Sequence, residues 1–151
     1  MKRLLVTTAL EETWGLDEQL FFLGDWCMVY SRRKIWSKRP CEIQPYHWKN
    51  RKKLAIDHDY VNHLYEHILL SLTVFLNNYH NLDRSIDYWR IIIGPWLFTW
   101  VAILWDRWES IRIALKECKF DSTIILDCTQ KDMIPNDYNE FTHYFQQDIW
   151  N

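Results

Sequence analysis

Glycine and proline are scarce in this chain: its 151 residues include only 3 glycines and 4 prolines. A β-sandwich or a propeller needs many tight turns, and tight turns depend on these two residues. The composition therefore argues against both architectures and favours long elements joined by few turns. Neither a G-x-G-x-x-G sequence nor a P-loop occurs, so the two best-known phosphate-binding loops are absent from the sequence.

The cysteines do not have the spacing of a metal or redox site. They stand 14, 77 and 10 positions apart and include no C-x-x-C pair; they are Cys27, Cys41, Cys118 and Cys128. This pattern favours a reduced, cytosolic protein and gives no indication of a metal or an organic cofactor.

Long hydrophobic runs are also missing. The apolar run at residues 4–10 ends at two glutamates with no cleavage site after it, so we expect no signal peptide. The longest uncharged stretch, residues 91–105, has 15 residues and is interrupted by Gly94-Pro95. A helix needs about 20 apolar residues to span a bilayer. We therefore expect a buried helix here, covered on several sides.

Aromatic residues, by contrast, are abundant: the chain has 10 tryptophans, and 17% of its residues are aromatic. This much flat apolar surface must lie in a core, in a binding cleft or against a partner. No sequence repeat is visible, and 48% hydrophobic with 25% charged residues is ordinary for one globular domain. We expect residues 1–151 to form a single α/β domain.

Charge is unevenly distributed along the chain. The formal net charge is −2, but residues 32–53 contain nine basic residues and one acid, which gives +8 there and −10 elsewhere. Trp36, Tyr46 and Trp48 are interleaved with these basic residues. The stretch could therefore bind a nucleic acid, the diphosphate of a nucleotide sugar or anionic lipid headgroups, or it could simply be a solvated basic surface. No nucleic-acid-binding motif accompanies it, so we expect no nucleic-acid partner.

The hydrophobic pattern predicts strands first and long helices later. Residues 3–8, 20–23 and, more weakly, 41–46 are short β-rich runs. Apolar residues at three- and four-residue steps predict an amphipathic helix over 54–79 and a second one over 86–116, kinked or broken at Gly94-Pro95. Residues 122–126 predict one more buried strand, and 136–150 one more helix. This alternation predicts a parallel sheet in an α/β layer fold.

The segment His63-Leu64-Tyr65-Glu66-His67 fits the zinc-protease pattern H-x-x-E-H. On a helical wheel its polar residues lie opposite the apolar stripe that contains Val61. We therefore expect these residues to face solvent, and the chain offers no convincing third ligand for a metal.

The loop after the first predicted strand contains Thr7, Thr8, Glu11 and Glu12. In open parallel sheets, ligands bind beyond the carboxyl ends of the strands, where carboxylates serve as general bases or hold sugar hydroxyls. The simpler interpretation makes the two glutamates early helix residues, with Thr8 as the cap. The residues alone favour this simpler interpretation.

Five motifs, taken in order, resemble the N-terminal part of a family of transferases encoded among bacterial O-antigen and other surface-polysaccharide genes. The motifs are T-T-A-L-E-E-T-W (7–14), F-L-G-D-W-C (22–27), P-Y-H-W (45–48), Y-W-R-I-I-I-G-P-W-L (88–97) and D-R-W (106–108). The resemblance implies a Rossmann-like N-terminal half of a two-domain GT-B-type sugar transferase, with short parallel strands and two long helices. It also implies that the chain is an N-terminal fragment of a longer protein.

The resemblance implies a function, and membership of the motifs combined with position near the predicted strand ends selects a set of candidate site residues. The chain would be the acceptor-side domain of a cytoplasmic glycosyltransferase that requires no cofactor, peripheral to the inner face of the membrane through residues 32–53. Glu11 or Glu12 would deprotonate the acceptor hydroxyl, with His47 as the reserve base. The enzyme would use a glycan or lipid-linked acceptor. The remaining candidates would bind substrate, with Arg90 and the basic stretch offsetting phosphate charge; they are Thr8, Trp14, Trp26, Trp48, Arg90 and Trp96.

The nucleotide-sugar donor would bind a C-terminal domain beyond residue 151. The isolated chain would then be inactive and self-associating. The alternative is a non-catalytic module that binds a glycan or a lipid-linked precursor through its aromatic surface. Nothing in the residues excludes this alternative.

Overall fold

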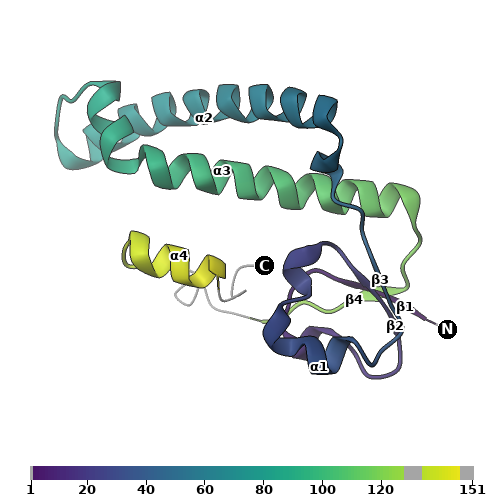
Figure 1. The fold of residues 1–151 in the computed structure, drawn as a ribbon. Coiled ribbons are helices and arrows are strands. Elements are labelled where there is room, and N and C mark those ends of the chain that lie inside the picture. Colours follow the sequence, from purple (N-terminus) through teal and green to yellow (C-terminus); the bar gives the residue numbers. More distant parts are fainter. Residues whose placement is uncertain (1, 128–133, 147–151) are drawn as a thin grey trace. The chain divides into compact units, whose positions relative to one another are not determined.

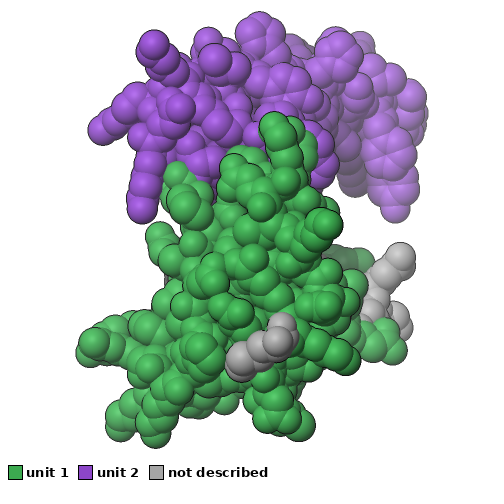
Figure 2. Space-filling view, turned by 90° about the vertical axis from the view of Figure 1, so that its right-hand side faces the viewer, with its two compact units in different colours: residues 1–46, 110–151 green, residues 47–109 purple. Residues whose placement is uncertain are grey.

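The computed structural model describes residues 2–127 and 134–146 (Figure 1). The chain divides into two compact units, coloured separately in Figure 2. Unit 1 comprises residues 1–46 and 110–151, and unit 2 comprises residues 47–109.

Unit 1 is built on a four-stranded parallel sheet with the strand order β3-β2-β1-β4. The strands are β1 (Arg3–Val6), β2 (Gln19–Phe22), β3 (Cys41–Ile43) and β4 (Ser122–Thr123). β1 and β2 are almost continuously apolar, and Leu4, Val6, Leu20 and Phe22 are at most 1% exposed. Such runs are typical of a parallel sheet buried on both faces. The predicted parallel α/β architecture and the first three predicted strands are confirmed.

Short elements connect the strands of unit 1. They are the 3₁₀ turns η1 (Glu11–Thr13), η2 (Asp25–Cys27) and η3 (Tyr30–Arg32) and the one-turn helix α1 (Arg33–Trp36). Helix α4 (Tyr138–Gln146) confirms the centre of the helix predicted over 136–150. Residues 147–150 of that prediction lie outside the described part of the chain.

The prediction of a buried strand over residues 122–126 is wrong in extent and in burial. β4 contains only two residues, Ser122 and Thr123, and both are exposed. Ile125 is 83% exposed. β4 pairs with β1 on one side only, as an edge strand. Ile124 still packs against the core of unit 1, but Ile125 and Leu126 are exposed despite their apolar composition.

Unit 2 consists mainly of two long helices that run side by side (Figure 1). After the 3₁₀ turn η4 (His47–Lys49), α2 spans Arg51–His80 and α3 spans Ile86–Glu117, whose last eight residues belong to unit 1. Asn50 caps α2 by accepting the backbone N–H groups of Lys52 and Lys53. Asn81, in the left-handed conformation, ends α2. Both predicted helices are confirmed.

Helix α3 is less covered than its sequence predicts. It is long and apolar enough to cross a membrane by length and composition alone, yet only 22% of its most apolar 18-residue window is buried. α2 covers one face, through a core that includes Val61, Leu69, Leu97 and Val101. The expectation of burial on several sides is therefore wrong. The helix also continues through Pro95 without a break, although Figure 1 shows its first turns running in a different direction from the rest.

Candidate functional site

The loop after β1 is fixed by hydrogen bonds within itself. The Thr8 hydroxyl oxygen accepts the backbone N–H of Leu10 at 3.0 Å and lies 3.1 Å from the Thr13 hydroxyl. The Thr13 hydroxyl donates to the Leu10 carbonyl at 2.6 Å. These bonds hold the chain in one turn directly before the two glutamates of η1, so the sequence-predicted Thr8 shapes the loop rather than capping an α-helix.

Two tryptophans brace the same loop. The indole N–H of Trp14 donates to the Thr8 carbonyl at 3.3 Å, and that of Trp26 donates to the Thr7 carbonyl at 3.2 Å. Trp14 is 1% exposed and packs edge-on against Phe22, with ring centroids 5.5 Å apart. Its ring therefore faces the core and offers no open surface for a sugar, whereas Trp26 is only partly buried.

The Trp26 ring lies directly against the backbone that follows β2. A Cβ atom placed on Gly24 would lie only 2.0 Å from the Trp26 ring. The backbone at Gly24 is extended (φ −176°), a conformation that any residue can adopt, so its conformation does not require a glycine. The close approach of the Trp26 ring does require one. Gly24 allows Trp26 to reach across to the loop after β1.

Carboxylates are exposed where several strands of the sheet end. Glu11 and Glu12 follow β1, Asp25 follows β2 and Asp127 follows β4. Since all four strands are parallel, the strand ends that these residues follow lie at one edge of the sheet. Arg32 supports this edge, because its guanidinium donates to the Ala9 carbonyl and lies 3.8 Å from the Glu11 carboxylate. The edge is able to accept a proton and to bind hydroxyl groups.

A second polar site, a buried charge cluster, lies within unit 2. His47 Nε2 lies 2.9 Å from Asp106 Oδ1, and His47 Nδ1 lies 3.8 Å from Asp57 Oδ2. Lys53 Nζ lies 2.8 Å from Asp57 Oδ2 and 2.7 Å from Glu109 Oε1. The side chains of the histidine and the three acids are at most 9% exposed. Both ring nitrogens of His47 face carboxylates, so this arrangement ties η4 and α2 to α3 and does not present the imidazole to a substrate.

The charges of this cluster shift the pKa values of its members. Burial alone would raise the pKa of Asp57, but hydrogen bonds from Lys53 and from the Trp48 indole, which lies 2.9 Å away, hold it below its usual value. Burial would lower the pKa of Lys53, and its hydrogen bonds to Asp57 and Glu109 raise it instead. Lys53 and Asp57 therefore remain charged near neutral pH.

The comparison with known families gives one match, to the LIC12162 family of transferases over residues 3–151. The chain belongs to this transferase family. Neither a curated protein nor a solved structure matches it. Membership of the LIC12162 family confirms the transferase part of the resemblance.

The other predicted site residues of this LIC12162 family member lie in unit 2, in different surroundings. Arg90 forms a two-pronged ion pair with Glu66, and this pair raises the pKa of the guanidinium. Trp96 stacks on Trp100, with centroids 6.5 Å apart, and Trp48 donates to the buried charge cluster. The structure thus gathers Thr8, Glu11, Glu12, Trp14 and Trp26 at one edge of unit 1.

The H-x-x-E-H segment has the exposure that the helical wheel predicts. His63, Glu66 and His67 all lie on the exposed face of α2. Within residues 2–127 and 134–146, no three His, Cys, Asp or Glu side chains are arranged to hold a metal ion.

The buried charge cluster and the role of Arg32 are not among the features predicted from the sequence. Asp57 lies four residues before Val61 and therefore on the apolar face of α2, which is unusual for an acid. Asp106 and Glu109 similarly interrupt the aromatic stretch of α3. Acidic residues on a predicted buried face could therefore have indicated a buried charge cluster from the sequence. The pairing of Arg32 with the loop after β1 had no signal in the sequence, because 21 residues separate Arg32 from Glu11.

Proposed function

We propose that this chain is the acceptor-side domain of a sugar transferase of bacterial surface-polysaccharide synthesis, with its site at the carboxyl edge of the sheet in unit 1. The observation that carries the proposal is the strand order β3-β2-β1-β4, with a braced loop and two exposed glutamates directly after the central strand β1. This order equals the first four strands of the dinucleotide-binding fold, in which ligands bind beyond the carboxyl ends of the strands. A Rossmann-like, GT-B-type half is the architecture that this order supports best.

The proposed chemistry is a direct transfer. Glu11 or Glu12 takes the proton of an acceptor hydroxyl, the hydroxyl oxygen forms a bond to the anomeric carbon of the donor sugar, and the bond from that carbon to the nucleoside diphosphate breaks. The Arg32 guanidinium lies 3.8 Å from the Glu11 carboxylate, on the same loop. The donor binds a further domain beyond residue 151 in this proposal, so unit 1 supplies the acceptor and the base.

The test is sugar transfer by the protein expressed from its complete gene. General-base catalysis contributes about 10² to 10⁴ in rate, so Glu11→Gln or Glu12→Gln should lower turnover by about that factor. Asp17→Asn is the matched control, because Asp17 is an exposed acid that precedes β2 and therefore lies at the opposite edge of the sheet. Wild-type turnover in both glutamate variants contradicts the catalytic assignment and favours a non-catalytic glycan-binding module.

A further inference from the structure

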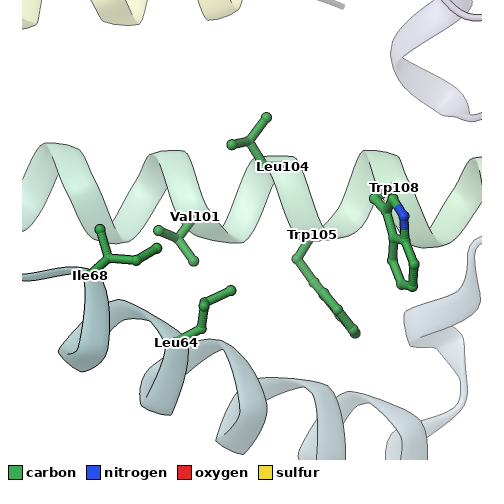
Figure 3. Close-up of a pocket in the computed structure, with 6 residues that line it drawn as sticks. All are labelled: Leu64, Ile68, Val101, Leu104, Trp105 and Trp108. Atoms are coloured by element: carbon green, nitrogen blue, oxygen red, sulfur yellow. The ribbon is translucent and has the colours of Figure 1, made fainter.

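An apolar groove lies between α2 and α3, entirely within unit 2 (Figure 3). Its volume is about 190 Å³, and the surface that it exposes is entirely apolar. The lining residues are Leu64, Ile68, Val101, Leu104, Trp105 and Trp108. A sugar or nucleotide site needs placed polar partners, which this lining does not expose. The groove therefore suits hydrocarbon.

The rim of the groove is open and aromatic. Leu104 is 51% exposed and Trp108 is 53% exposed. The Trp108 ring lies 5.1 Å from the Trp105 ring, which in turn lies 4.4 Å from the ring of Tyr60 on α2. Clusters of tryptophan and tyrosine beside aliphatic side chains are typical of the surfaces that proteins place at a membrane–water interface.

Three exposed cations lie at the same end of the two helices as these rings. They are Lys49, Arg51 and Lys52, at the start of α2. The contact of 2.7 Å between Lys53 Nζ and Glu109 Oε1 places this start beside the part of α3 that carries Trp105 and Trp108. An apolar aromatic surface next to exposed lysine and arginine is complementary to anionic lipid, whose headgroups attract cations while its acyl region accepts apolar side chains.

We propose that this end of unit 2 binds the surface of an anionic lipid bilayer. Trp108 and Leu104 enter the headgroup–acyl boundary, and the three cations bind lipid phosphates. The proposal narrows the sequence-based expectation of membrane contact to residues 49–52 and the groove, and it does not depend on the transfer reaction.

A second copy of the chain fits this surface less well. A two-fold dimer brings the same patch of both copies together, so it would place the two sets of cations close to each other. Like charges at such an interface repel each other. Anionic lipid has the opposite charge and is therefore the occupant that the surface favours.

The experiment is co-sedimentation of the 151-residue chain with vesicles of phosphatidylcholine alone and with vesicles containing equal parts of phosphatidylglycerol. We expect binding to the anionic vesicles and little to the neutral ones. Replacing Lys49, Arg51 and Lys52 together by Gln should lower the partition coefficient into the anionic vesicles about a hundredfold, because each lost cation weakens binding about fivefold. The matched control replaces Arg33, Lys34 and Lys38, three exposed cations of the same basic stretch in unit 1, and should have little effect.

The contribution of the apolar groove is tested by the double variant Trp108→Ser and Leu104→Ser. This variant should bind the anionic vesicles at least about tenfold more weakly. Its control is Leu16→Ser in unit 1, since Leu16 is 91% exposed. Equal losses in the two lysine–arginine triple variants would overturn the proposal, as would unchanged binding in the serine variant. Self-association that the serine substitutions abolish, with vesicle binding unchanged, would make the groove an interface between copies. If the serine variant does not fold, the charge variants decide, because their side chains lie outside the core.

Discussion

Replacing Lys53 in the buried charge cluster should destabilise unit 2 severely. Lys53 is the residue that pairs with both Asp57 and Glu109, whose side chains are 6% and 3% exposed. Lys53→Met keeps the length and apolar stem of the side chain and deletes only its charge and its hydrogen-bond donors. Two buried carboxylates then lose a shared partner.

The magnitude follows from this burial. Removing one partner of a buried ion pair costs about 3 to 5 kcal/mol. Because the Lys53 side chain is 26% exposed, water replaces part of its interaction, and we expect the lower end, about 3 kcal/mol. Domains have total stabilities of about 5 to 15 kcal/mol, so this loss is a large share of the whole.

Urea unfolding followed by far-ultraviolet circular dichroism measures this loss, since α2 and α3 provide most of the helical signal. With a denaturant slope of about 2 kcal/mol per molar urea, the midpoint should fall by about 1.5 M. Lys52→Met is the matched control: Lys52 is exposed and adjacent, and its substitution should change the stability by less than about 0.5 kcal/mol.

A second substitution tests the cause of the loss. Adding Glu109→Gln to Lys53→Met replaces one of the two buried acids that lost the lysine by a neutral amide and should recover part of the stability. A midpoint for Lys53→Met no lower than that for Lys52→Met would contradict a role of Lys53 in stability. A double variant that loses the sum of both single effects would contradict the stated cause of the loss.

Three further predictions concern single residues. The pKa of Asp57 is lower in the folded chain than in the unfolded chain. Its contribution to stability is therefore complete above the unfolded value of about 3.9 and is lost as pH falls through the folded value. Asp57→Asn should flatten the acid limb of a plot of unfolding free energy against pH. Gly24→Ala should cost about 1 to 3 kcal/mol and shift the indole N–H resonance of Trp26, since the added Cβ would clash with the ring; an unshifted resonance would contradict the close approach. Arg39→Gln should cost at least about 2 kcal/mol in thermal or urea unfolding, because the guanidinium donates to four backbone carbonyls of residues 14–18; a change no larger than that of Lys38→Gln would contradict this role.

The elements of the fold that depend on local pattern could be predicted from the sequence. The long apolar period of α2 and the short β-rich runs of β1 and β2 reflect burial on a helix face and in a parallel sheet, so their type and approximate bounds follow from the residues. The strand order could not be predicted, because it depends on which strands pair across long separations. The same limit affected residues 122–126, whose apolar composition gave no sign that β4 is a short edge strand.

The candidate site could be predicted only in part. Position after a predicted parallel strand was enough to select the loop of Glu11 and Glu12. The braces of that loop could not be found, because Trp26 and Arg32 reach it from later segments of the chain. The sequence also suggested a binding role for a residue that has a structural one. Arg39 belongs to the basic stretch 32–53, but its guanidinium donates hydrogen bonds to backbone carbonyls of residues 14–18.

The most direct measurement of the central proposal is ¹H–¹⁵N NMR of the 151-residue chain titrated with oligosaccharides released from bacterial lipopolysaccharide. The indole N–H groups report on both units. That of Trp26 donates to the loop after β1, and that of Trp89 donates to Asn77 within unit 2. An acceptor bound at the carboxyl edge of the sheet should shift the Trp26 resonance and leave that of Trp89 unchanged. A shift confined to Trp89, or no shift of either resonance at saturating oligosaccharide, would contradict the placement of the acceptor site in unit 1.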